Sequence, residues 1–210
     1  MINRAELKMQ ARNQLRGKWG LAIGGTIVGC FLITFIMNLI LRLVRDDTTL
    51  ILIVQLVSMI ISSIMSIGMC RFSLNYAYEG KEPAFGDIFS GFKVALKAIG
   101  LFFLMGIIIF VGIILLVVPG VIFSFMFSQA LYILADDNSK SIIQCLKESA
   151  GMMKGYKFKY FVLSLSFLGW IILGLIPFGI GLLWVIPYMN VTVASFYLKV
   201  KNNYYGSNHV

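Results

Sequence analysis

The sequence predicts an all-α, polytopic membrane protein with six transmembrane helices in three hairpins, each preceded by an amphipathic helix on the cytoplasmic face. Of the 210 residues, 59% are hydrophobic and only 13% are charged, about half the charge of a soluble domain. A disordered chain is excluded because it needs low hydrophobicity and high charge. The apolar residues fall into runs near the ~20 residues that cross a ~30 Å hydrocarbon core.

The first element is a basic amphipathic helix over residues 3–18. Leu7, Ala11 and Leu15 are four residues apart and therefore share one helical face. Asn3 followed by Glu6 is a variant of the capping box that begins helices. The segment is too polar to span, so it predicts a helix on the inner membrane surface.

The first hairpin consists of the uncharged runs 19–41 and 50–69, joined by a short charged connection. Its first run opens with small residues four apart, which favour close packing against another span or, alternatively, a homodimer seam. These residues are Gly20, Gly24, Gly25 and Gly29.

The second hairpin follows an interfacial helix near residues 83–93, whose apolar positions are spaced i, i+3, i+4, i+7. These positions are Phe85, Ile88, Phe89 and Phe92. The runs 98–118 and 121–135 then meet at Pro119-Gly120, which suits the central positions of a type II turn.

The third hairpin follows an amphipathic helix capped by residues 136–139, with one apolar face of Ile142, Ile143, Leu146, Ala150 and Met153. The runs 160–176 and 182–198 are joined by a Pro- and Gly-containing turn at 177–181. The whole chain is thus one integral membrane domain: residues 1–18 form the amphipathic helix, 19–198 the six-span bundle and 199–210 a polar, mobile cytoplasmic tail.

The basic residues orient this domain. With the N-terminus inside, 16 of the 18 basic residues lie in inner segments, and only Arg42 and Arg45 lie outside. The positive-inside rule therefore places both termini in the cytoplasm. The net charge of +9 favours the anionic inner leaflet as partner rather than nucleic acid, because the basic residues flank apolar runs. Candidate lipid contacts are Arg4, Lys8, Arg12, Arg16, Lys18, Lys154, Lys157 and Lys159.

Two stretches carry a resemblance to a known family: NRAELKMQARNQLRGKWGLAIGG at the start, and LKESAGMMKGYKFKYFVLSLSFLGWIILGLIPFGIGLLWVIPYMNVTVASFY near the end. The chain resembles the bacterial integral-membrane family catalogued as domain of unknown function 975. The resemblance implies a six-span plasma-membrane protein, mostly of Gram-positive bacteria, without an assigned activity.

Uncharged polar residues within the runs are the candidate site. They favour either hydrogen-bonded contacts between helices or a cavity for a lipid or small substrate. Pro187 adds a kink that frees a backbone carbonyl in the sixth run. The candidates are Gln55, Ser62, Ser128, Gln129, Tyr188, Asn190 and Thr192.

No catalytic, cofactor or metal site is expected. The runs contain no Asp, Glu, Lys, Arg or His, and the only histidine is His209. The adjacent acids Asp136 and Asp137 are explained by helix capping. The sequence therefore predicts a non-enzymatic scaffold or accessory protein that engages anionic lipid, with a homo-oligomer or a membrane-protein partner as further options. The alternatives are a small transporter or immunity-type protein that handles a lipid or amphipathic peptide, and an enzyme acting on lipid headgroups.

Overall fold

The computed structural model describes residues 3–44 and 47–207, and every regular element in these ranges is helical. Two elements depart from the α-helix: the π-helix η1 (Ile27–Leu32) and the 3-10 helix η2 (Phe85–Val94). The others are α1 (Arg4–Leu15), α2 (Trp19–Thr26), α3 (Ile33–Leu43), α4 (Thr48–Ala77), α5 (Ala95–Leu115), α6 (Val117–Met126), α7 (Ala130–Asp136), α8 (Ile142–Met152), α9 (Lys157–Leu175) and α10 (Leu182–Ser207).

Among the described residues, five helical segments are long and apolar enough to cross a membrane: Trp19–Leu43, Thr48–Ala77, Phe85–Leu115, Val117–Asp136 and Lys157–Leu175. They correspond to the first five predicted runs and make the chain a multi-pass membrane protein. The predicted sixth run, 182–198, forms the first part of α10 and is not among the five. Polar residues such as Asn190 and Thr192 interrupt its apolar character.

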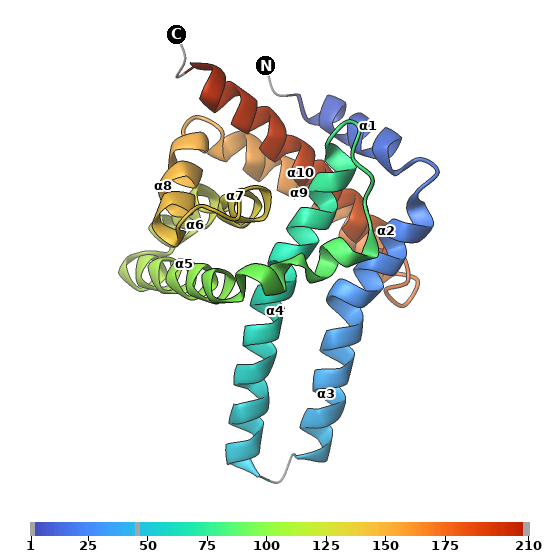
Figure 1. Cartoon of the computed structure of the whole chain (residues 1–210), viewed down its shortest axis with the longest axis vertical. Coiled ribbons are helices and arrows are strands. Elements are labelled where there is room, and N and C mark those ends of the chain that lie inside the picture. Colours follow the sequence, from blue (N-terminus) through green and yellow to red (C-terminus); the bar gives the residue numbers. More distant parts are fainter. Residues whose placement is uncertain (1–2, 45–46, 208–210) are drawn as a thin grey trace.

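The hairpins point in different directions (Figure 1). Helices α3 and α4 extend together, away from the other helices, whereas α5 runs across the direction of α4. The expected three hairpins therefore do not stand side by side as one bundle. The core lies instead where α4, α7, α8, α9 and α10 meet, around Leu74, Ile133 and Phe196, each 0% exposed.

The apolar face of α1 is buried within the protein. Leu7, Ala11 and Leu15 are at most 1% exposed, and α1 packs against α10 and α4. The predicted cap is confirmed, since Asn3 accepts a hydrogen bond from the N–H of Ala5 at 3.0 Å. The expectation that this face lies on the membrane is wrong, because the ends of two longer helices bury it first.

The second amphipathic segment is a 3-10 helix, and its predicted face is divided. Ile88 is 0% exposed against α4, whereas Phe85, Phe89 and Phe92 are 47–52% exposed. With three residues per turn, Ile88 and Gly91 share one side, and this side packs into α4. The predicted period of 3.6 residues placed Phe89 and Phe92 with Ile88, whereas three residues per turn put them on another side. Phe85 is exposed at the first residue of η2.

The turn between α5 and α6 lies at Leu116 rather than at Pro119-Gly120. Leu116 is extended, with φ −166° and ψ 142°. Pro119 instead lies in the first turn of α6, where N–H groups have no helical acceptor. Gly120 allows the two helices to approach closely, because a Cβ there would lie 2.4 Å from the Ile113 side chain. By contrast, the predicted turn at 177–181 is confirmed, with φ +81° at Gly179.

Two further expectations near the C-terminal end are corrected. Helix α8 is capped by Ser141, whose side chain accepts from the N–H of Gln144, and Ile143 is 59% exposed rather than part of the apolar face. The buried face contains Cys145 and Ser149 instead, so it is rotated about the helix axis relative to the predicted face. The tail predicted from residue 199 is helical through Ser207, because α10 continues and buries Val200. His209 lies outside the described residues.

Candidate functional site

A cavity of about 380 Å³ lies where the first hairpin meets α7 and α10. Its lining combines apolar side chains with uncharged polar ones. Thr34 and Ser66 donate hydrogen bonds to carbonyls of their own helices, and Tyr132 donates to the backbone carbonyl of Asn190 at 3.4 Å. The lining residues are Gly29, Cys30, Ile33, Thr34, Ser62, Met65, Ser66, Met69, Cys70, Tyr132 and Asn190.

Asn190 is the central residue of this region. Together with Tyr132 it also lines a second cavity of about 310 Å³, between α7, α9 and α10. Within the described chain, no hydrogen bond involves the side-chain amide of Asn190. An amide that is half-buried beside two cavities can therefore offer a donor and an acceptor to a ligand.

The π-helix η1 shapes one wall of the larger cavity. Gly29 and Cys30 lie within η1 and line the cavity. A Cβ at Gly29 would lie 2.3 Å from the sulfur of Met69, so the Met69 side chain packs directly against this glycine. Single π-turns within α-helices often mark functional sites.

Of the other predicted polar residues, Tyr188 joins two helices, whereas Thr192, Ser128 and Gln129 form local hydrogen bonds. Tyr188 donates to the backbone carbonyl of Lys8 at 3.3 Å, and Thr192 donates to that of Tyr188 at 2.7 Å. Ser128 donates to the carbonyl of Phe125, and the side chain of Gln129 donates to Ser128. Ser62 lines the larger cavity. Gln55 is exposed on α4 and lines none of these cavities.

Ser149 of α8 stabilises the break between α6 and α7. Its hydroxyl donates to the carbonyl of Met126 at 2.8 Å and accepts from the N–H of Gln129 at 3.3 Å. The Oε1 atom of Gln129 is buried without a partner in the described part of the chain. Ser149 was not predicted as a functional residue, because a single serine in an amphipathic helix does not stand out in the sequence.

The predicted lipid-contacting cations are mostly exposed. Arg4, Arg12, Arg16, Lys18, Lys154 and Lys159 are exposed, whereas Lys8 and Lys157 are half-buried. The ammonium of Lys8 donates to the carbonyl of Ser166 at 3.1 Å and lies 4.2 Å from the centre of the Phe167 ring. Burial lowers the pKa of Lys8, and the charge of Arg4 lowers it further.

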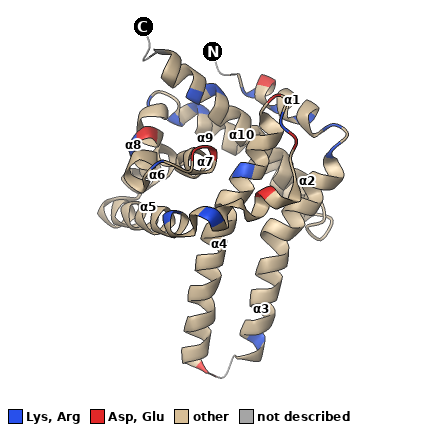
Figure 2. Ribbon diagram, viewed as in Figure 1, with Lys and Arg blue, Asp and Glu red and all other residues tan. Residues whose placement is uncertain are grey.

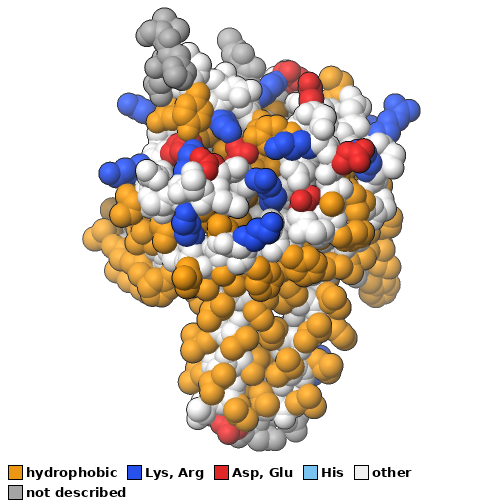
Figure 3. All heavy atoms as spheres, viewed as in Figure 1, with side chains coloured by type: hydrophobic (Ala, Val, Ile, Leu, Met, Phe, Trp, Pro, Cys, Tyr) orange, Lys and Arg blue, Asp and Glu red, His pale blue; other side chains and the backbone are white. Residues whose placement is uncertain are grey.

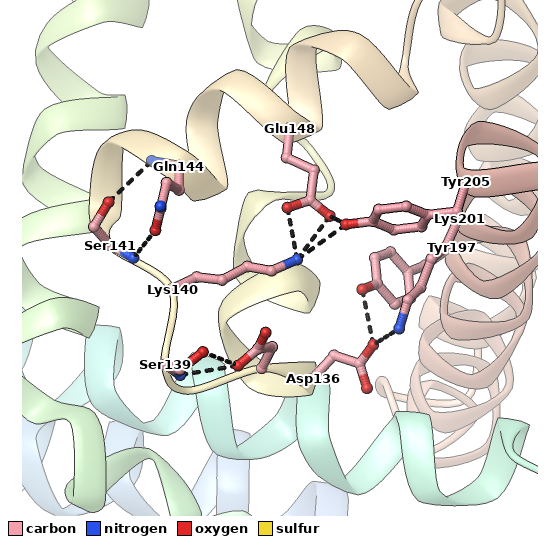
Figure 4. A network of polar contacts seen from close by, with 10 residues as sticks. Asp136, Ser139, Lys140, Ser141, Gln144, Glu148, Tyr197, Lys201 and Tyr205 are labelled. Carbon is pink, nitrogen blue, oxygen red and sulfur yellow. Dashed lines mark hydrogen bonds and ion pairs between the residues drawn. The ribbon is translucent and has the colours of Figure 1, made fainter. Parts of the chain in front are cut away.

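An ionic network that the sequence did not predict joins the end of α4 to α7 and α10 around Asp136. Figure 4 shows the contacts of Asp136 with Tyr197 and Lys201 of α10. Its carboxylate accepts hydrogen bonds from Tyr78 at 2.8 Å, from Tyr197 at 3.0 Å and from the ammonium of Lys201. Burial raises the pKa of Tyr78, and its hydrogen bond to Asp136 raises it further. Asp136 therefore has a tertiary role, and the capping role predicted for it is wrong. Asp137 alone forms the local turn, by accepting from Ser139.

A second ion pair continues this polar region toward α8. Lys140 contacts Glu148 at 2.6 Å, and Tyr205 donates to the same carboxylate. These acids are thus occupied by donors from the same chain. Among the described residues, no group of three His, Cys, Asp or Glu side chains could hold a metal ion. The geometry is that of a network joining the ends of helices.

Residues 101–204 match the model of a family described as a protein of unknown function, DUF975. Over these residues, the chain belongs to the DUF975 family. The predicted resemblance is confirmed for the stretch near the end of the chain, whereas the opening stretch lies outside the match. The matched part of this DUF975 protein runs from α5 to α10 and contains both Asn190 and Asp136. The chain matches no curated protein and no solved structure.

Proposed function

We propose that this DUF975 protein is a non-enzymatic scaffold or accessory protein of a bacterial plasma membrane that engages anionic lipid. One observation supports this proposal: the charged residues gather at one end of the molecule, above a continuous apolar band (Figures 2 and 3). At the far end of the first hairpin, Arg42 and Asp47 are the charged residues among those described. We call this charged end of the molecule, which includes the exposed residues Arg4, Arg12, Arg16, Lys18 and Lys154, the cap, as distinct from the caps of single helices.

Helix α1 supplies a fixed basic rim to the cap. Because Leu7 and Leu15 are buried against the protein, the neighbouring side of the helix, whose basic residues are spaced four apart, is held in place. This side carries Arg4, Arg12 and Arg16. A basic residue near an anionic leaflet contributes ~1 kcal/mol of attraction, so a rigid rim of several gives a substantial preference for anionic lipid.

The proposed orientation places the cap and both termini in the cytoplasm, following the distribution of basic residues. The proposal includes six membrane-embedded apolar segments as three hairpins. In intact cells with cysteine-free protein, an impermeant thiol reagent should label Thr48→Cys at the hairpin end and not Arg16→Cys on the cap. The reverse labelling pattern would overturn the orientation.

Lipid engagement should be visible in the lipids that surround the protein. Particles cut from the membrane by styrene–maleic acid copolymer should contain a higher ratio of anionic to zwitterionic lipid than the bulk membrane. Replacing Arg4, Arg16, Lys18 and Lys154 by glutamine should lower this ratio toward the bulk value, since ~1 kcal/mol is lost for each charge. The matched control is Arg42→Gln at the far end of the hairpin, which should leave the ratio unchanged. An undiminished ratio in the four-residue variant would contradict the proposal.

A second candidate function is the binding or transport of a neutral or amphipathic molecule, including an immunity-type role. The observation that favours it is the cavity of about 380 Å³ beside Asn190, which has uncharged polar groups among apolar side chains. Ligand sites typically have ~300–1,000 Å³ and a few polar groups in an apolar wall.

Substitution of Asn190 distinguishes a ligand-binding role of its side chain from a role as a contact between helices. Because its amide has no protein partner in the described structure, Asn190→Leu should leave the melting temperature in detergent unchanged. The control Thr192→Val removes a buried hydroxyl that donates to Tyr188, so it should cost about 1 kcal/mol. A loss of ~0.6–2 kcal/mol for Asn190→Leu would instead identify Asn190 as a contact between helices. The mass of any small molecule retained by the purified protein, lost only in Asn190→Leu, would support the cavity.

A further inference from the structure

Helices α1 and α9 lie side by side and run parallel. Near their starts, Arg4 and Lys159 line one groove. One to two turns on, Lys8 contacts Ser166. Near their ends, Arg12 and Trp170 line a larger groove. The basic side of α1 therefore runs beside α9 from Lys159 to Trp170.

This pairing sets the depth of the second groove in the membrane. Arg4, Arg12 and Arg16 are exposed, and charged side chains are costly in the hydrocarbon core, so α1 belongs at the membrane surface. The end of α9 and the start of α10 lie beside Arg12 and Trp19 in the same groove. Arg12 consequently places one end of that groove at the level of the lipid headgroups on the cap side, and the groove continues from there along the apolar end of α9.

The groove contains an unusual set of side chains. Its volume is about 530 Å³, and all three tryptophans of the chain line it. Within the described chain, Arg12 is the only charged residue of the lining, which consists of Arg12, Trp19, Trp170, Leu173, Gly174, Gly181, Trp184, Val185 and Tyr188. Trp170 and Trp184 are about half exposed. Gly174 and Gly181 pack closely at its base, since a Cβ at Gly181 would lie 2.6 Å from the Cα of Gly174.

We propose that this groove binds one anionic phospholipid of the cap-side leaflet. The guanidinium of Arg12 is a bidentate donor suited to a phosphate. Tryptophan favours the interface, where its ring contacts the upper acyl chain and its N–H can reach an ester oxygen. Leu173 and Val185 continue the apolar wall for the chain. The site rests on the proposed function and deepens it, from a general attraction to a defined position for one lipid.

The tryptophans provide the measurement, because the protein's indole fluorescence arises only from this groove. The full-length protein is reconstituted into two bilayers with the same proportions of phosphatidylcholine and phosphatidylglycerol. In one bilayer the phosphatidylglycerol carries brominated chains, and in the other an equal amount of the phosphatidylcholine does. Bromine quenches indole on contact, so only the identity of the neighbouring lipid differs. We expect about a five-fold preference for phosphatidylglycerol, the contribution of one basic residue.

Variants on α1 distinguish a defined site from the general charge of the cap. Arg12→Gln should abolish the preference, and Arg12→Lys should retain most of it. The matched control is Arg16→Gln, an exposed arginine one turn away that does not line the groove. An unchanged melting temperature for each variant shows that folding is intact. Equal quenching in the two bilayers by the unmodified protein would overturn the site.

The remaining outcomes separate the site from the proposed function. If Arg12→Gln and Arg16→Gln lower the preference equally, the cap attracts anionic lipid generally, and the defined site is wrong while the proposed function stands. If the preference depends on Arg12 alone but the lipids of the excised particles show no anionic enrichment, the site stands and the broader engagement by the cap is wrong.

Discussion

Gly68→Ala should be severely destabilising, and the expected loss is at least ~3 kcal/mol, at the upper end of the range for overpacking. A Cβ at Gly68 of α4 would lie 1.7 Å from the carbonyl oxygen of Ile88 in η2. The colliding atoms would be the new Cβ and a backbone oxygen, and neither moves when a side chain changes rotamer, so no rotamer change can relieve the contact. The two helices would have to separate and expose Ile88, which is fully buried.

The same crossing makes a reciprocal prediction at Gly91. A Cβ there would lie 2.0 Å from the carbonyl oxygen of Ile64, so Gly91→Ala should be comparably destabilising. The matched control is Gly106→Ala in α5, where a Cβ would have nothing within 4 Å. That change should be neutral or stabilise by ~0.5–1 kcal/mol, because glycine is unfavourable within a helix. Melting temperatures in one detergent compare the three variants, and equal values for Gly68→Ala and Gly106→Ala would contradict the close crossing.

Features that depend on local sequence could be predicted. The first five apolar runs are helical because hydrophobic length and the absence of charge are local properties. Asn3 could be identified as a cap, and the segment around Gly179 as a turn, because each depends on a few neighbouring residues. The interruption at Leu116 could not, because nothing in an unbroken apolar run marks which residue becomes extended.

Features that depend on tertiary partners could not be predicted from the sequence. The apolar face of α1 could be identified, but amphipathicity does not distinguish a membrane surface from the ends of α4 and α10. Segment η2 is a 3-10 helix packed closely on α4, so a helical pattern of 3.6 residues misplaced Phe89 and Phe92. Direction of packing, rather than helix content, is what the sequence failed to specify.

The candidate sites show the same division. Asn190 and Ser62 could be selected as polar residues in apolar runs, and both line the larger cavity. Tyr132 could not, because a tyrosine at that position is equally suited to packing. The three tryptophans were individually typical of interfacial anchors, and only the packing of α1 and α2 beside α9 and α10 brings them into one groove with Arg12.

Asp136→Ala should be the second strongly destabilising change, with a loss of about 3 kcal/mol. The side chain of Asp136 is only 9% exposed, and it accepts from Tyr78, Tyr197 and Lys201. Removing the carboxylate leaves two hydroxyls and one ammonium without their acceptor. Because the side chain of Lys201 is 28% exposed, water can reach the ammonium in part, which keeps the loss at the lower end of the range for buried pairs.

An exposed ion pair provides the control for Asp136→Ala. Glu6 and Lys199 are 2.5 Å apart, with side chains 51% and 32% exposed, and solvent weakens such pairs. Glu6→Gln should therefore leave the melting temperature almost unchanged. If Glu6→Gln and Asp136→Ala have equal effects, the Asp136 network does not hold α4, α7 and α10 together.

A double variant identifies the origin of the loss at Asp136. If the loss comes from stranding the ammonium of Lys201, adding Lys201→Met to Asp136→Ala should recover a large part of the melting temperature, because an apolar side chain of similar length needs no counter-charge. If the loss comes instead from the hydrogen bonds that Tyr78 and Tyr197 donate, the double variant should melt no higher than Asp136→Ala. Asp136→Asn separates the two further, since an amide oxygen still accepts from the tyrosines but carries no charge for the lysine. Recovery by Lys201→Met together with a clear loss for Asp136→Asn would establish that charge neutralisation, rather than hydrogen bonding alone, fixes the end of α10 to α7.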